Sequence, residues 1–375
     1  MALGILIFAA GIFVMIVVHE LGHFVTAKRY GIKVEEFFVG FGPRLWSVRR
    51  GETEYGLKAL PLGGYVRIAG MNPFQESAPE DRDRVFTAKP AWQRAIVLVS
   101  GALTHFVLAF VLLVSFFWFV GVPVFGGAQV VGVSDELEGQ PSPAAQAGLQ
   151  PGDRFVRYDG RPVQDYEEFL EYIDTHTGQE ISLVVERDGE RVPLRVTPTE
   201  VRDRNELIGR LGIVVSEAVV ARDRSGPVEG LADAGRAMGQ MVVGSFRAIG
   251  QVFGPEGISR VAQLLTGEGE RSPADPVGVV GAARVSGQAV AAGQAEVFFS
   301  LFAFFNVFVG IVNLFPLPPL DGGHLAVLGI ERATGRRIDQ RKLIPITALV
   351  AGFLLLFTFS LVYLDVVRPI PNPFQ

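Results

Sequence analysis

ALGILIFAAGIFVMIVVHELGHFVTAKR, residues 2–29, joins a long apolar run to two histidines and a glutamate and ends on basic residues. A helix that spans a bilayer needs about 20 mostly apolar residues, and this run supplies them. It lacks the basic start and small-residue cleavage site of a signal peptide, so we expect it to be retained. Ionisable groups inside a spanning segment are costly and rare without a function. The HELGH pentapeptide at 19–23 is therefore the first candidate site.

HELGH follows the pattern H-E-x-x-H. Positions i and i+4 share one helix face, so His19 and His23 can bind a single Zn²⁺. The adjacent Glu20 can take a proton from a water that the metal activates. The pattern predicts hydrolytic chemistry, with Glu20 as the catalytic base and the two histidines as metal ligands.

A third ligand is expected near the other end of the chain, because two imidazoles alone hold zinc weakly. Residues 313–324 read NLFPLPPLDGGH, where prolines unwind the backbone and Gly322 and Gly323 permit close approach. Asp321 is the predicted ligand. His324 is a rival, ranked lower because it points toward a basic loop. Asn313 is expected to bind an extended substrate strand, or else to be a helix-packing amide.

The composition agrees with a membrane protein. Of 375 residues, 49% are hydrophobic and only 19% are charged. The net charge of -5 gives no basic surface for phosphates, so we expect no nucleic-acid partner. The absence of cysteine excludes disulfides, thiolate metal sites and a cysteine nucleophile, and leaves His, Asp and Glu as the side chains available to a metal.

Apolar runs predict four membrane spans and hence a multi-pass α-helical protein. The spans are Ala2–Val18, Ala95–Val120, Val297–Phe315 and Leu343–Val367. Basic residues follow the first and third spans, which places those ends in the cytoplasm and both termini and the long region between spans two and three outside.

Two glycine-rich apolar stretches lie between the first two spans, FFVGFGPRLW at 37–46 and LKALPLGGYVRIAGM at 57–71. They are too short to span a bilayer, and their alternation favours β-strands. We interpret them as a hairpin that re-enters the membrane, which is tolerated where protein or a wet cavity covers the backbone. A cytoplasmic hairpin that touches the headgroups is the alternative.

The outside region has two parts. Residues 128–198 alternate short strand patterns with one helical stretch, the profile of a small α+β module. Residues 230–252 show the spacing of an amphipathic helix, which we expect to lie on the membrane or on a neighbouring domain. The predicted organisation is an N-terminal membrane half (1–127), the module (128–198), a connector (199–296) and a C-terminal membrane half (297–375).

These motifs resemble the site-2 protease family of intramembrane zinc metalloproteases, peptidase M50, and in particular its bacterial regulator-of-sigma-E type. The resemblance covers nearly the whole chain, through HELGH, FVGFGPRL at 38–45, PLGGYVRIAGM at 61–71 and NLFPLPPLDGG at 313–323. It implies zinc held by His19, His23 and Asp321, with Glu20 as general base. It also implies a membrane-reentrant hairpin at about 56–70 that aligns the substrate, where we expect Gly63, Gly64 and Tyr65 to bind it.

The family further implies a location in the plasma (inner) membrane and cleavage of single-span membrane proteins, such as an anti-sigma factor or a leftover signal peptide. The outside module resembles a bacterial PDZ domain, because AAQAGLQPGD at 144–153 matches the turn of that group. PDZ domains bind extended peptides by strand addition. Two rival functions remain at this point, a divalent-cation transporter and a non-catalytic PDZ adaptor anchored in the membrane.

One departure from the family lies on the second span. The family usually shows G-P-x-x-N, whereas residues 101–105 read GALTH. We expect His105 to hydrogen-bond a residue of the active-site cleft or the substrate backbone, and not to bind zinc permanently, because a fourth protein ligand would close the position that water needs. A packing or lipid-facing histidine is the alternative.

Overall fold

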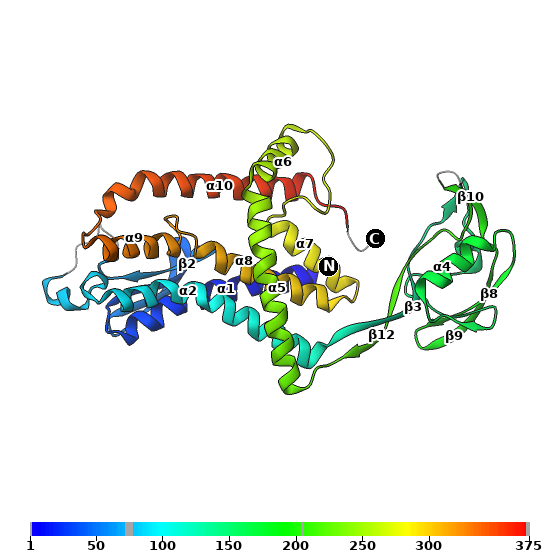
Figure 1. Cartoon of the computed structure of the whole chain (residues 1–375), viewed down its shortest axis with the longest axis horizontal. Helices are drawn as coiled ribbons and strands as arrows, with labels where there is room; N and C mark the ends of the chain where they lie inside the picture. The colour runs from blue at the N-terminus through cyan, green and yellow to red at the C-terminus, as the bar shows by residue number, and fades with distance from the viewer. Residues whose placement is uncertain (1, 72–77, 204–205, 373–375) are drawn as a thin grey trace. The chain divides into compact units, whose positions relative to one another are not determined.

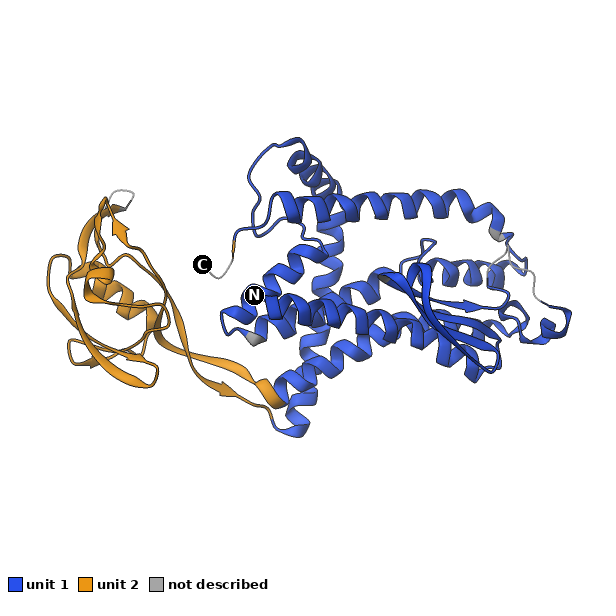
Figure 2. Ribbon diagram, turned by 180° about the vertical axis from the view of Figure 1, so that it is seen from behind, with its two compact units in different colours: residues 1–118, 226–371 blue, residues 119–225, 372–375 orange. Residues whose placement is uncertain are grey.

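The computed structural model describes residues 2–71, 78–203 and 206–372, which form two compact units. Unit 1 comprises residues 1–118 and 226–371, and unit 2 is principally residues 119–225 (Figure 2). The helices of unit 1 are α1 (Ala2–Arg29), α2 (Ala91–Ser115), α5 (Pro227–Phe253), α6 (Pro255–Thr266), α7 (Val279–Ala291), α8 (Ala295–Asn313), α9 (Asp321–Thr334) and α10 (Ile344–Val367). Short turns of other helical type are η1 (Pro79–Arg84), η2 (Phe86–Ala88), η3 (Phe116–Val120) and η4 (Gln340–Leu343).

Four helices in the described residues are long and apolar enough to span a bilayer, at Ala2–Arg29, Ala91–Val120, Glu296–Asn313 and Arg341–Val367. They coincide with the four predicted spans. α1 packs against α2, and α2 packs against α8, while α10 runs roughly parallel to them and contacts α6 and α7 (Figure 1). α2, unbroken by the proline that the family usually has, continues as one α-helix to Ser115.

α5 crosses the long helices at a steep angle (Figure 1). The predicted amphipathic helix over 230–252 therefore exists, and it is slightly longer. Its apolar face, which includes Ala234 and Ile249, joins a buried cluster with Leu113 of α2 and Val307 of α8. Protein covers that face of α5. Other residues of the same helix, such as Val228 and Phe246, remain exposed.

The predicted hairpin is formed by β1 (Val34–Arg50) and β2 (Thr53–Ile68), which pair antiparallel. Both strands bend, so residues 34–39 pair with 54–57 on one side and with 64–68 on the other. The hairpin is thus larger than the predicted 56–70 and resembles a small folded sheet. Residues 64–68 lie at its edge, next to α1.

Ion pairs and apolar contacts attach this hairpin to the helices. Glu52, at the tight turn between the strands, accepts hydrogen bonds from Lys28 at 2.5 Å and from Arg84 at 2.6 Å. Burial opposes ionisation of Glu52, but these two cations outweigh it and hold its pKa below the ordinary value. The strand ends Val34 and Ile68 are buried in one cluster with residues of α1 and α2.

Unit 2 is an α+β module. Its elements are β3 (Val122–Val133), β4 (Glu136–Leu137), β5 (Gln140–Pro141), α3 (Pro143–Ala147), β6 (Arg154–Tyr158), β7 (Arg161–Pro162), α4 (Tyr166–Thr175), β8 (Ile181–Arg187), β9 (Glu190–Val196), β10 (Thr199–Asp203), β11 (Glu206–Arg210) and β12 (Ile213–Asp223). The main sheet has the order β12-β3-β6-β8-β9, with β7 added beside β6, and Phe155, Phe169 and Leu183 are at the centre of its core.

The predicted boundaries of this module are too narrow. β12 pairs along the whole of β3, from Ile213 opposite Val133 to Asp223 opposite Val122. The two strands belong to one sheet although about 80 residues separate them, so the compact unit runs from 119 to 225 and not from 128 to 198. Long-range pairing of this kind leaves no local signal in the sequence.

The loop after α6 is held by buried charges. Arg271 donates to Asp365 of α10 at 2.7 Å, and the two side chains are 3% and 0% exposed. The other oxygen of Asp365 accepts the backbone N–H of Gly281 in α7 at 2.7 Å. This ion pair attaches the end of α10 to α7 and to the loop that follows α6.

The Arg271–Asp365 pair generates a stability prediction. Asp365→Ala leaves the buried guanidinium of Arg271 without its counter-charge, and removing one partner of a buried pair costs about 3–5 kcal/mol. We expect a large loss of thermal stability in detergent. Ser360→Ala on the same helix should stay within about 0.5 kcal/mol of the parent, because its hydroxyl bonds only a carbonyl of its own helix. Equal melting temperatures for the two variants would contradict this role.

Candidate metal centre

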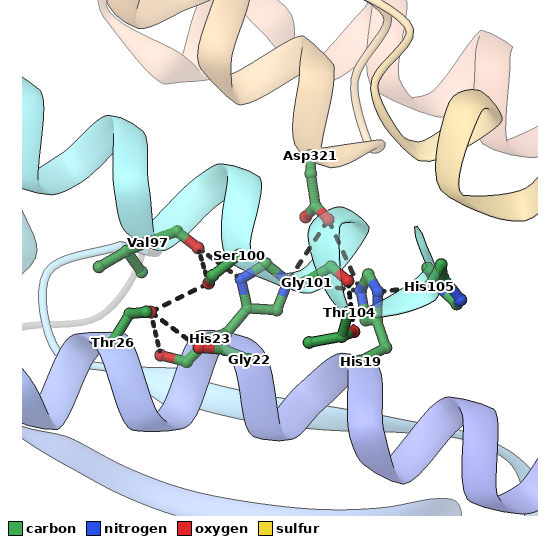
Figure 3. A network of polar contacts seen from close by, with 10 residues as sticks. All are labelled: His19, Gly22, His23, Thr26, Val97, Ser100, Gly101, Thr104, His105 and Asp321. Carbon is green, nitrogen blue, oxygen red and sulfur yellow. Dashed lines mark hydrogen bonds and ion pairs between the residues drawn. The ribbon is translucent and has the colours of Figure 1, made fainter. Parts of the chain in front are cut away.

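Three side chains from two distant segments converge on one point (Figure 3). His19 and His23 extend from α1, with their Nε2 atoms 3.3 Å apart. Oδ2 of Asp321, the first residue of α9, lies 3.6 Å from Nε2 of His19 and 3.4 Å from Nε2 of His23. The structure thus brings together the three predicted ligands, which form the metal-binding group found among the described residues.

The donor atoms fit a zinc ion. Oδ2 of Asp321 is enclosed and has no hydrogen-bond partner, although a buried carboxylate is costly unless a proton donor or a cation neutralises it. Zn–N and Zn–O bonds of about 2.0–2.2 Å in a tetrahedron require ligand atoms about 3.3–3.6 Å apart. The three measured separations fall in this range.

Contacts to the second nitrogen of each imidazole set its orientation. Nδ1 of His23 donates to the backbone carbonyl of Val97 in α2 at 2.7 Å, which leaves Nε2 free for a metal. Nδ1 of His19 lies 3.0 Å from Nε2 of His105, also in α2. His105 is 3% exposed. The structure therefore places His105 beside His19, on the side of that imidazole away from Asp321 and His23.

Two glycines permit α1 and α2 to approach closely enough for these contacts. A Cβ on Gly22 would lie 2.6 Å from the carbonyl oxygen of Ser100, and a Cβ on Gly101 would lie 2.2 Å from Nε2 of His23. Small residues at a helix interface allow backbones to approach in this way. Thr26 adds a hydrogen bond to the hydroxyl of Ser100 at 2.9 Å.

A tight turn positions Asp321 at the beginning of α9. The chain folds back after α8, and a Cβ on Gly322 would lie 2.1 Å from the carbonyl oxygen of Leu314. A Cβ on Gly323 would lie 2.3 Å from the backbone nitrogen of Pro318. No other residue type fits at these two positions, which explains the Gly-Gly pair after the aspartate.

Glu20 lies beside the three ligands but is outside their group. It is close enough to His23 and Asp321 to interact electrostatically with both side chains. The hairpin approaches it directly, because a Cβ on Gly64 would lie 3.1 Å from Cγ of Glu20. The edge of the hairpin sheet therefore lies beside the predicted base.

The other predicted site residues are not among the three converging ligand groups. Tyr65 donates its hydroxyl to Glu36 at 2.5 Å, and its ring stacks on Phe38. A Cβ on Gly63 would lie 2.5 Å from the ring of Phe41. Asn313 is the last residue of α8 and is half-buried.

His324, the rival ligand, is also outside the group. It lines a cavity of about 350 Å³ with apolar residues that include Leu98 and Val327. It follows Asp321 by three residues on α9, and its side chain lines this cavity and is not one of the converging ligand groups.

The sequence analysis did not identify two polar groups near the site, a backbone carbonyl and a side-chain amide. The carbonyl of Val97 could not be found, because any residue type supplies a backbone oxygen. Asn306 of α8 could have been identified from the sequence, because an amide side chain inside an apolar span is rare without a function. It is fully buried next to His105.

Comparison with known proteins agrees with this site. The model of peptidase family M50 matches residues 7–358. Zinc metalloprotease Rip1 of Mycobacterium tuberculosis is 35% identical over 98% of both chains, and metalloprotease MmpA of Caulobacter vibrioides is 32% identical over 86% of this chain and 85% of that one. The PDZ domain of an SdrC-like protein from Listeria monocytogenes is 22% identical with a TM-score of 0.21, covering 24% of this chain and 90% of that one.

The fold and site define a multi-pass membrane metallopeptidase. The chain belongs to peptidase family M50. The predictions of a metalloprotease with zinc as its cofactor are confirmed at the level of this family.

The close approach at Gly101 can be tested by adding one methyl group. Gly101→Ala should displace the His23 imidazole and weaken zinc binding by at least about tenfold, the effect typical of disturbing a ligand's surroundings. Gly329→Ala in α9 is the matched control, because its Cβ meets nothing within 4 Å. Zinc content after dialysis against a weak chelator measures both. A Gly101→Ala protein that keeps its zinc would show that the helices can separate without loss of the site.

Proposed function

We propose that this protein is an intramembrane zinc endopeptidase that cleaves single-span membrane proteins. One observation carries the proposal: an enclosed carboxylate oxygen without a hydrogen-bond partner faces two imidazole nitrogens, next to a glutamate, on helices long enough to span a bilayer. His19, His23 and Asp321 hold the zinc, and Glu20 is the general base.

Zinc, when bound, supplies Lewis acidity for peptide hydrolysis. Glu20 takes a proton from the attacking water and later gives it to the leaving amine, as a carboxylate beside a metal site can. The carbonyl of Val97 and the ring of His105 keep the two imidazoles oriented. With three protein ligands, a bound zinc ion would keep one coordination position available to water or substrate.

The hairpin presents the substrate. A transmembrane helix must unwind before its peptide carbonyls are accessible, because helical hydrogen bonds occupy them. Residues 64–68 pair with β1 on one side, so their other edge can accept an extended segment by strand addition. Gly64 brings that edge to Glu20 and to Ile16 of α1, which supports a hairpin at membrane depth.

The remaining features suit a protease of the inner membrane. The basic residues after α9 support a cytoplasmic position for that loop, and hence a topology with both termini and unit 2 outside. Unit 2, as a PDZ domain, binds or excludes extended peptides from the substrate's outer part. A leftover signal peptide or a truncated anti-sigma factor has the required single span.

The test is cleavage by purified full-length protein in detergent or vesicles, with a panel of single-span substrates. Glu20→Gln should keep its zinc, because Glu20 is not a ligand, and should lose at least about 10²–10⁴-fold in rate, because the general base is lost. Glu256→Gln, an exposed glutamate on α6, should cleave normally. Substantial turnover by Glu20→Gln would sink the mechanism. Metal flux without cleavage by the parent protein would favour a transporter.

The third ligand is tested by comparing two substitutions three residues apart. Asp321→Asn should lower zinc occupancy, because an amide is a poorer zinc ligand than a carboxylate. His324→Asn should leave zinc occupancy unchanged, because His324 lies outside the ligand group. Metal analysis of both proteins decides between the two residues. The reverse pattern would assign the third position to His324.

A further inference from the structure

Two buried polar atoms behind His19 need a partner. Nδ1 of His105 and Oδ1 of Asn306 are both enclosed and make no ordinary hydrogen bond. His105 is 3% exposed and Asn306 is fully buried. An unpaired buried donor or acceptor costs about 1–3 kcal/mol. Asn306 lies next to the His105 ring.

The proton positions follow from one requirement, that Nε2 of His19 keep its lone pair for a metal. The neutral His19 ring then carries its proton on Nδ1, which lies 3.0 Å from Nε2 of His105. That Nε2 must be the acceptor. A neutral His105 therefore carries its own proton on Nδ1, on the side away from His19.

Asn306 supplies the acceptor for this second proton. Its Nδ2 donates to the carbonyl of Phe302, one turn earlier on α8, at 2.8 Å. This bond fixes the amide so that Oδ1 is the atom that remains available. α2 and α8 are in close contact here, since a Cβ on Gly310 would lie 3.1 Å from Cβ of His105.

We propose that Asn306 is a positioning residue that acts on the metal ligand His19 through His105. Oδ1 of Asn306 accepts Nδ1–H of His105, Nε2 of His105 accepts Nδ1–H of His19, and Nε2 of His19 is thereby held free and oriented. The inference rests on the proposed role of His19 as a zinc ligand. It also explains why the two residues occur together, because a histidine at position 105 can accept a hydrogen bond from His19 only if another group takes its own proton.

Zinc release to an excess of chelator tests the chain of hydrogen bonds without reference to proteolysis. Asn306→Leu keeps the volume but removes the acceptor, and should bind zinc about 10–100-fold more weakly, as loss of a ligand's supporting partner typically does. Ser286→Ala, which alters an equally buried polar side chain on α7, should release zinc at the parental rate. Parental zinc release from Asn306→Leu would overturn the proposal.

A rescue separates positioning from packing. The Oε1 atom of a glutamine reaches about as far as Nε2 of a histidine, and it is always an acceptor, because an amide has no alternative tautomer that a second partner must fix. His105→Gln should therefore retain zinc, and adding Asn306→Leu to it should cause little further loss. An equal loss in both backgrounds would show that Asn306 only fills space.

The proton position can be observed directly. Nitrogen NMR of isotopically labelled imidazoles in the zinc-loaded protein should show the His105 proton on Nδ1, with the signal assigned through His105→Gln. A proton on Nε2 would overturn the proposal. If zinc binds but does not depend on His19 or Asp321, the proposed metal centre itself fails, and that outcome is distinct from a failure of the Asn306 role alone.

Discussion

The arrangement of the membrane unit depends on one electrostatic constraint, a carboxylate oxygen enclosed opposite two imidazole nitrogens. Such a group is unfavourable in an apolar surrounding unless a cation compensates it. Burying it without a hydrogen bond is therefore a sign of a site built for a metal. The relative positions of α1 and α9 bring these atoms within about 3.5 Å of one another, as a shared metal ion requires.

Close contact between α1 and α2 helps to hold the two imidazoles in this arrangement. The interface between α1 and α2 contains glycine where a side chain would collide, at Gly22 and Gly101. The same closeness lets backbone and side-chain groups of α2 reach the far nitrogens of both histidines. In a membrane, where burial of apolar surface does not drive helices together, such packing and polar contacts provide the association. One set of contacts thus serves both stability and metal binding.

The site also needs elements that are not spanning helices. The hairpin sheet brings the strand edge formed by residues 64–68 to Glu20, and ion pairs to Glu52 attach the hairpin to α1 and η1. The folded turn before α9 carries Asp321 to the two histidines, more than 290 residues away in the sequence. Rigid attachment of these pieces suits a reaction that must hold an unwound peptide against a metal, because catalysis depends on precise placement.

The sequence by itself predicted the four spans, the hairpin, the amphipathic helix and the three residues that converge as a candidate metal site, because apolar runs, alternation, the H-E-x-x-H spacing and the Pro- and Gly-rich turn at Asp321 are local patterns. Tertiary structure alone decided three features. β12 lies beside β3, which extends unit 2 to residue 225, because strand partners far apart share no local signal. The carbonyl of Val97 and the amide of Asn306 lie behind the histidines, since only helix packing places one helix's groups at another's nitrogens. The Arg271–Asp365 pair is buried, although each residue by itself looks like an ordinary charge in a loop or at a helix end.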